Sequence, residues 1–208
     1  MMFFSKVKAN LKPISNQNID YLIVGLGNPK PEYFNNRHNI GFSIIQKIIE
    51  KKQLQIFDKT KYYILYLDES NNHRVLYALP LTFMNASGIA IRKIVVKYHI
   101  PIEKVVIIVD EYNFPVGKIH IKQGGSDGGH NGVASIIAEL ENPNFIRLRC
   151  GIARNFGPGE LTDYVLSDFP EEEMPLVNEM KDKAERAIYY LIEQGFARAS
   201  SDINSGKI

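Results

Sequence analysis

The sequence contains a single cysteine, Cys150, among its 208 residues. One thiol forms no internal disulfide, which excludes a disulfide-stapled secreted fold and favours a reducing compartment such as the cytoplasm. Because Cys150 lies in an apolar, strand-like stretch, we expect it to be a buried structural thiol. Long apolar runs are missing as well. None reaches the roughly 18–20 residues that span a bilayer, so no membrane association is predicted.

A large excess of either charge is also missing. The 25 Lys and Arg residues against 23 Asp and Glu leave a formal charge of +2, so any nucleic-acid binding must depend on a local basic patch. Residues 1–18 contain three lysines, no arginine and no adequate apolar core. This pattern predicts a flexible N-terminal extension rather than a signal peptide or an organelle leader.

Hydrophobic periodicity predicts an alternation of strands and helices. Ile40, Ile44 and Ile48 fall on one face of a helix, whereas residues 105–109 are five β-branched residues in succession, typical of a strand covered on both faces. The same reasoning along the chain predicts strands at 21–24, 62–67, 74–79, 105–109, 117–123 and 145–152. Helices are predicted at 39–53, 86–98, 131–140, 160–167 and 171–195.

This alternation indicates an α/β fold. We predict a single-domain three-layer sandwich, in which helices flank a mixed, largely parallel central sheet. No internal repeat or linker divides the sequence. The domain is therefore expected over residues 19–200, followed by a C-terminal tail at 201–208.

Two asparagines follow predicted strands. Asn28 belongs to the run GLGNP at 25–29, which stands where a dinucleotide-binding fingerprint would begin, but Lys30 occupies the place of its third glycine. A tight turn that presents Asn28 at the carboxyl end of a strand is the better interpretation. Asn85 lies between a strand and a helix and is either a helix cap or an amide directed into a pocket.

A histidine and an aspartate could form a catalytic pair. His38 begins the first predicted helix, where the positive end of the helix dipole disfavours an imidazolium, and a general base must be neutral. Asp110 ends the strand at 105–109 and is placed to fix the tautomer of a neighbouring imidazole. Taken singly, each residue could also be a cap or a surface residue. A metal site of His38, Asp110 and His130 lacks the usual ligand spacing, so no metal is predicted.

The run GGSDGGHNG at 124–132 contains a literal G-x-S-x-G around Ser126, the pattern of a serine-hydrolase nucleophile. That nucleophile requires strand, serine and helix in immediate succession, but two further glycines delay the helix here. The only later histidine is His130, four residues on, so the usual order of serine, acid and histidine also fails. The glycines more readily allow the backbone to approach a phosphate-bearing ligand.

Basic side chains alternate along two predicted strands. Lys118, His120 and Lys122 share one face of the strand at 117–123, and Arg147 and Arg149 alternate on the strand at 145–152. They are either solvated strand charges or a phosphate-binding patch beside the glycine-rich loop.

Seven motifs in this order make the chain similar to the bacterial peptidyl-tRNA hydrolase family. They are GLGNP at 25–29 with Tyr33, RHN at 37–39, TFMN at 82–85, DE at 110–111, PVGK at 115–118, GGHNG at 128–132 and FIRLRCGI at 145–152. The resemblance extends over about residues 20–200, and seven spaced matches are far more specific than any one motif.

The resemblance implies an α/β hydrolase that needs no metal or cofactor and cleaves the ester between a peptide and the terminal ribose of its tRNA. It implies that His38 is the catalytic base and Asp110 its orienting partner. The substrate-binding residues implied by the resemblance are Asn28, Tyr33, Met84, Asn85, His130 and Asn131. Lys122 and Arg149 resemble the clamp on the 5′ phosphate of the tRNA acceptor stem. Peptidyl-tRNA is the expected partner of a monomeric, cytoplasmic enzyme.

The chain departs from the family pattern in one turn, and two functions other than peptidyl-tRNA hydrolysis are alternatives. Tyr112 and Asn113 stand in a turn that is usually acidic and leucine-rich, and Tyr112 is expected to narrow the pocket. A non-enzymatic RNA-binding relative would keep the fold and the basic patch but lose His38, Asp110 or the asparagines, all of which are present. A small-molecule esterase would instead use Ser126.

Overall fold

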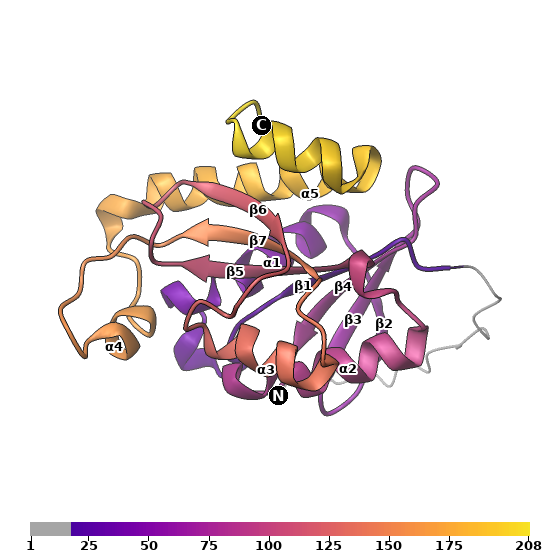
Figure 1. Ribbon diagram of the computed structural model, residues 1–208, viewed down its shortest axis with the longest axis horizontal. Helices are drawn as coiled ribbons and strands as arrows, with labels where there is room; N and C mark the ends of the chain where they lie inside the picture. The colour runs from indigo at the N-terminus through magenta and orange to yellow at the C-terminus, as the bar shows by residue number, and fades with distance from the viewer. Residues whose placement is uncertain (1–17) are drawn as a thin grey trace, which may run out of the picture.

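In the computed structural model, which describes residues 18–208, a seven-stranded sheet runs through the centre of the molecule (Figure 1). The strands are β1 (Tyr21–Gly25), β2 (Ile56–Lys59), β3 (Tyr63–Asp68), β4 (Val75–Pro80), β5 (Val105–Glu111), β6 (Ile119–Gln123) and β7 (Ile146–Gly151). Their order in the sheet is β2-β3-β4-β1-β5-β7-β6. The four central strands β4, β1, β5 and β7 are parallel, and the outer pairs are antiparallel.

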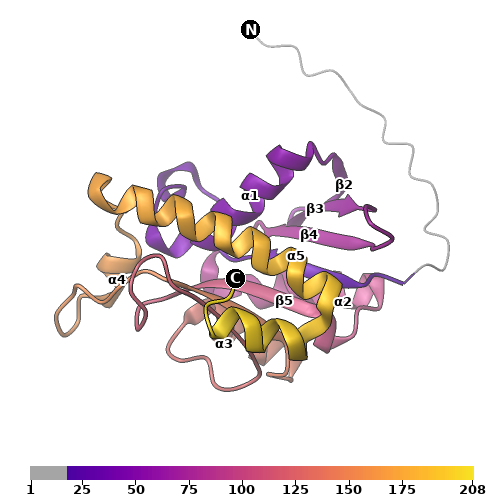
Figure 2. The same cartoon turned by 90° about the horizontal axis from the view of Figure 1, so that it is seen from above.

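Helices cover both faces of the sheet. The long helices are α1 (Ile40–Lys52), α2 (Ser87–Tyr98), α3 (Asn131–Leu140) and α5 (Met174–Asn204). α1 and α5 lie over one face, and α2 and α3 over the other (Figures 1 and 2). The short helix α4 (Leu161–Val165) lies beyond the carboxyl ends of β5 and β7 (Figure 1). The predicted three-layer α/β sandwich with a mixed sheet is therefore confirmed.

The hydrophobic core has two parts, one on each face of the sheet, because successive side chains of the central strands point to opposite faces. Ile23 and Ile108 face α1 and α5, whereas Leu22 and Ile107, their neighbours in sequence, face α2 and α3. Because both faces of these strands are buried, the strands are apolar throughout, as a central parallel strand requires. Cys150 is buried in the core between the sheet and the helices α1 and α5, as expected for a structural thiol.

Two glycines bring α1 directly onto the sheet. A Cβ atom at Gly25 would lie 2.2 Å from the carbonyl oxygen of Gly41, and one at Gly41 would lie 2.4 Å from the carbonyl oxygen of Ile108. Backbone hydrogen bonds of 3.1 Å from Leu26 to Ile108 and from Phe42 to Leu26 join β1, α1 and β5 at the same place. The start of α1 is thereby fixed against the end of β5.

The C-terminal helix is longer than predicted. α5 continues to Asn204, across a break at Gly195, whose φ of 75° lies in the left-handed region that favours glycine. Ile203 is buried, and the Asn204 carboxamide makes two 2.9 Å hydrogen bonds with the backbone of Ile121 in β6. Residues 201–204 therefore belong to the folded domain, which corrects the tail expected at 201–208.

Most other predicted elements lie within a few residues of the observed ones, but β2 was not predicted. The expected N-terminal extension at 1–18 lies, apart from its last residue, outside the described residues. Over residues 18–208, no helix is both long and apolar enough to cross a membrane.

Candidate active site

A cavity of about 480 Å³ opens at the carboxyl ends of the central strands. This is the edge at which open α/β sheets bind their ligands, because the loops that follow the strands gather there. Of the ten predicted site residues, nine line the cavity: Asn28, His38, Met84, Asn85, Asp110, Lys122, His130, Asn131 and Arg149. Residues far apart in the sequence thus meet in one place.

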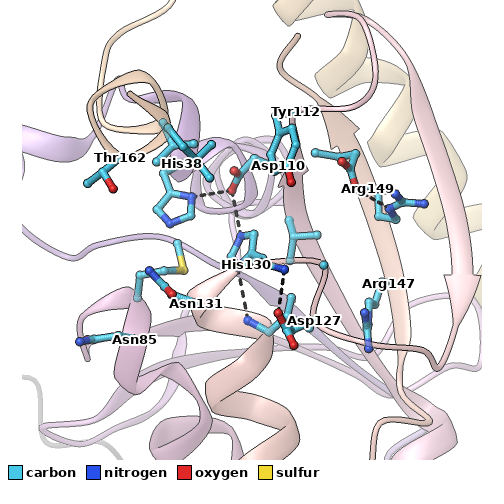
Figure 3. A pocket seen from close by; sticks show the side chains of 18 of the residues that line it. His38, Asn85, Asp110, Tyr112, Asp127, His130, Asn131, Arg147, Arg149 and Thr162 are labelled. Carbon is cyan, nitrogen blue, oxygen red and sulfur yellow. Dashed lines mark hydrogen bonds and ion pairs between the residues drawn. The ribbon is translucent and has the colours of Figure 1, made fainter. Parts of the chain in front are cut away.

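His38 and Asp110 form a buried hydrogen-bonded pair (Figure 3). His38 lies in the 3₁₀ helix η2 (Arg37–Asn39) that precedes α1, and Asp110 lies in β5, near its end. The distance from His38 Nδ1 to Asp110 Oδ1 is 2.8 Å. Since the ionised carboxylate only accepts, Nδ1 carries the proton, and the lone pair of the ring lies on Nε2. Nε2 has no hydrogen-bond partner within residues 18–208.

The pKa of His38 is raised above its ordinary value of 6.5. Burial acts to lower it, but the charge of Asp110 and its hydrogen bond outweigh burial. The helix end, which favours a neutral imidazole, is therefore opposed by a buried carboxylate oxygen 2.8 Å from Nδ1. Burial likewise opposes ionisation of Asp110, but the two histidines beside it hold the pKa of its carboxyl well below its usual range.

His130 is the second histidine on Asp110. Its Nε2 lies 3.0 Å from the same oxygen, Asp110 Oδ1, and its ring lies 4.8 Å from that of His38. As the N-cap of α3, His130 accepts at Nδ1 from the backbone N–H groups of Gly132 and Val133. Both ring nitrogens are thereby used, and the proton must lie on Nε2. His38, with a free Nε2, is the one of the two that can accept a proton.

The same hydrogen bonds bear on metal binding. The ligand atoms of His38, Asp110 and His130 lie within 4.8 Å of one another, a spacing that could hold an ion. However, a metal at His130 Nε2 would need a lone pair there, and two backbone donors at Nδ1 keep that lone pair on the other nitrogen. The donor set fits a network of hydrogen bonds and does not fit a metal centre.

Asn28 presents an oriented amide to the cavity. Its Oδ1 accepts a 2.8 Å hydrogen bond from the backbone N–H of Met84, which fixes which side of the carboxamide is oxygen. The side chain of Asn39 makes two 2.9 Å hydrogen bonds with the Asn28 backbone: its Oδ1 accepts from the N–H, and its Nδ2 donates to the carbonyl oxygen. The Nδ2 group of Asn28 is left with no hydrogen-bond partner among the described residues, and it can donate to a ligand.

The other two asparagines and Tyr33 lie farther out. Asn85, in the 3₁₀ helix η3 (Met84–Ala86), and Asn131, the first residue of α3, are exposed at the cavity wall (Figure 3). Tyr33 ends the 3₁₀ helix η1 (Pro31–Tyr33) and does not line the cavity, contrary to the expectation. The turn that begins at Pro31 places it outside, half-exposed.

The glycine-rich loop is held by an arginine. Gly124, Gly125, Gly128 and Gly129 all adopt positive φ angles, which glycine alone adopts without strain. Arg147 donates to the carbonyl oxygens of Gly125, at 2.6 Å, and Ser126. Arg147 thus shapes the loop, a role that its alternation with Arg149 did not reveal.

Ser126 lacks the environment of a nucleophile. It is exposed in the loop, four residues before the N-cap of α3, so strand, serine and helix do not follow one another. No hydrogen bond joins its hydroxyl to a histidine in the described part of the chain.

Lys122 and Arg149 lie on the adjacent strands β6 and β7 and form the basic side of the cavity. The Glu111 carboxylate accepts hydrogen bonds from Arg149 Nε, at 2.9 Å, and from Arg149 Nη2. This ion pair was not predicted. Lys122 forms no salt bridge within residues 18–208, and its pKa is lowered by burial and by the neighbouring Arg147 and Arg149, against an opposing effect of Glu111. An anion bound here would relieve this crowding of positive charge.

Known proteins resemble this chain in both sequence and fold. The sequence profile of the peptidyl-tRNA hydrolase family matches residues 22–208. Peptidyl-tRNA hydrolases of Shouchella clausii and Listeria monocytogenes are each 39% identical to this chain over 88% of its length, and the matches cover 99% and 98% of those proteins. The crystal structure of peptidyl-tRNA hydrolase from Acinetobacter baumannii superposes with a TM-score of 0.84 at 33% identity, covering 90% of this chain and 97% of that one. The chain therefore belongs to the peptidyl-tRNA hydrolase family.

Proposed function

We propose that this chain hydrolyses the ester of peptidyl-tRNA and releases free peptide and tRNA, with His38 as the general base. The observation that carries the mechanism is the His38–Asp110 pair, in which Nδ1 is bound at 2.8 Å and Nε2 is free at the cavity. The base acts on water, so no covalent nucleophile is needed. A general base of this kind contributes roughly 10²–10⁴-fold to the rate.

The proposed reaction has two proton transfers. His38 Nε2 takes a proton from water, whose oxygen attacks the ester carbonyl carbon and forms a tetrahedral oxyanion. The carbon–oxygen bond to the ribose then breaks, and the imidazolium returns the proton to the leaving ribose oxygen. Asp110 stabilises the imidazolium between these steps. The Nδ2 group of Asn28 is the donor that we assign to the developing oxyanion.

The basic side of the cavity supplies the tRNA contact in this proposal. Lys122 and Arg149 would bind the 5′ phosphate of the acceptor stem, while Asn85 and Asn131 contact the terminal adenosine and the peptide. Phosphate contacts position a nucleic acid without regard to its sequence, so these two contacts would not distinguish one tRNA from another. As the family resemblance implies, we propose that the enzyme acts as a monomer in the cytoplasm.

The rate of peptide release from an N-acylated aminoacyl-tRNA, measured from pH 5 to 9, tests this function. Because only neutral His38 accepts a proton, the rate is expected to rise with pH. The inflection is expected above 6.5, because the Asp110 charge raises the pKa of His38. A flat profile, with the chemical step shown to be rate-limiting, would contradict the role of His38. Binding of tRNA without any turnover would favour the non-enzymatic RNA-binding alternative.

Replacing Lys122 with alanine is expected to weaken tRNA binding and to reduce the slope of log Kd against log salt concentration by about 1. The physical reason is that one fewer phosphate counterion is released. Binding of deacylated tRNA at several salt concentrations measures both quantities. Lys104→Ala is the matched control, since Lys104 precedes β5 at the end opposite Asp110 and should leave the slope unchanged. An unchanged slope in Lys122→Ala would refute the phosphate contact.

A further inference from the structure

The helix α4 forms one wall of the cavity without a hydrophobic core of its own. Its segment lines the cavity with Leu161, Thr162, Val165 and Leu166, yet α4 contains no buried residue. Thr162 lies on the same side of the cavity as His38 (Figure 3). Its apolar residues are only partly buried, so burial, the usual means of fixing a helix, is incomplete here, and other contacts help to hold this wall in place.

Those contacts converge on Arg37, the residue before His38. Its guanidinium carbon lies over the rings of Tyr164 and Phe169, at 4.6 and 4.7 Å from their centres. Its Nη1 donates to Glu173 at 2.6 Å and to the carbonyl oxygen of Ile152 at 3.4 Å. One side chain thus connects the turn that carries His38 with α4, with the start of α5 and with the end of β7.

Neighbouring contacts strengthen the same connection. The backbone N–H of Arg37 donates to the carbonyl oxygen of Ser167 at 3.0 Å, and Asn36 forms an isolated β-bridge with Asp168. The Tyr164 hydroxyl donates to the carbonyl oxygen of Ile152 at 2.6 Å. The face of Tyr164 that α4 offers to Arg37 is therefore itself oriented.

Stability alone does not account for an arginine at this place. The side chain is 6% exposed, and its Nε is buried with no hydrogen-bond partner in the described structure. A buried charge with an unsatisfied N–H is costly, and apolar residues would cover two aromatic rings without that cost. Arginine does provide a planar group that stacks and forms an ion pair at once, which fixes both the position and the angle of α4.

We infer that Arg37 is a positioning residue that holds α4 as the substrate-binding wall beside His38. The wall presents Leu161, Val165 and Leu166 to the peptide part of the substrate, so its loss would weaken binding of the peptide more than that of the tRNA. This inference rests on the proposed function for its kinetic consequence. The attachment of α4 by Arg37 is a separate claim, measurable without turnover.

The test compares Arg37→Lys and Arg37→Met with the wild type. Lysine keeps the charge, but it lacks the planar guanidinium that stacks on the rings and presents several donors in one plane. Both variants are therefore expected to lose the attachment of α4. Hydrogen exchange of the backbone amides of residues 162–166 is expected to rise about tenfold or more, with α1 and β5 unchanged. The KM for N-acylated aminoacyl-tRNA is expected to rise by about tenfold, more than kcat falls, while the Kd of deacylated tRNA stays the same.

Arg92→Met is the matched control, because Arg92 also pairs with a glutamate but lies exposed on α2, outside the cavity. If Arg37→Met does not fold, the charged variant Arg37→Lys decides alone, with its melting temperature as the check. Wild-type exchange in α4 in a folded variant would overturn the attachment. Raised exchange with an unchanged KM would overturn the positioning role. Absence of turnover in the wild type would instead refute the proposed function. The exchange result would still decide whether Arg37 holds α4 in place.

Discussion

The variant His38→Ala is expected to lose most of its activity, with kcat lower by roughly 10²–10⁴-fold. His38 offers the only free imidazole nitrogen of the pair of histidines on Asp110, because both nitrogens of His130 are used. Single-turnover release of peptide from N-acylated aminoacyl-tRNA measures the chemical step directly. Binding of tRNA should be nearly unchanged, because the basic side of the cavity is intact.

Ser126→Ala is the informative companion of that variant. Both substitutions truncate a polar side chain that lines the cavity, but only one removes the proposed base. Ser126→Ala is expected to retain a rate close to that of the wild type. Loss of activity in Ser126→Ala together with an active His38→Ala would show that the enzyme is a serine esterase.

The second large effect is expected from Asp110→Asn. An amide of nearly the same shape removes the charge that outweighs burial at His38, so the pKa of His38 should fall below 6.5. The amide can also present its NH₂ group to His38 Nδ1, which moves the ring proton to Nε2 and blocks the base. We expect kcat to fall by roughly 10²–10⁴-fold and the inflection of the pH profile to move to lower pH.

A remote carboxylate provides the control for Asp110→Asn. Asp58 in β2 also accepts several side-chain hydrogen bonds, among them 2.7 Å from Lys97 and 2.8 Å from Tyr98, but it lies outside the cavity. Asp58→Asn should leave both the rate and the pH profile unchanged. An Asp110→Asn enzyme with the wild-type inflection would show that Asp110 does not set the basicity of His38.

The fold was largely predictable because its strongest signals are local. The five β-branched residues of β5 and the isoleucine stripe of α1 are each decided within one element. β2 was missed because it has four residues, and its Ile56 is 53% exposed, so it lacks a clear pattern. The C-terminal boundary was placed too early because the contacts of Asn204 are with β6, 83 residues away.

The candidate site was predictable in its membership but less so in its chemistry. The motifs named His38, Asp110 and His130. That both histidines share one oxygen of Asp110, and that backbone donors fix the tautomer of His130, depends on distances between separate elements. For the same reason, no local pattern revealed the partners of Arg147 and Arg149, which are the loop carbonyls and Glu111. The raised pKa of His38 could not be predicted from its place at a helix start, because it depends on the charge of Asp110, 72 residues away in the sequence.

The hydrogen bonds of Asn204 have a consequence for the behaviour of the protein in concentrated solution. β6 is the last strand of the sheet, so its outer backbone groups are a template on which another chain could add a strand. Asn204 uses both the N–H and the carbonyl oxygen of Ile121, in the middle of that strand. The last turn of α5 thereby blocks the addition of another strand at this edge of the sheet, which opposes edge-to-edge aggregation. It also covers β6, the strand that carries Lys122.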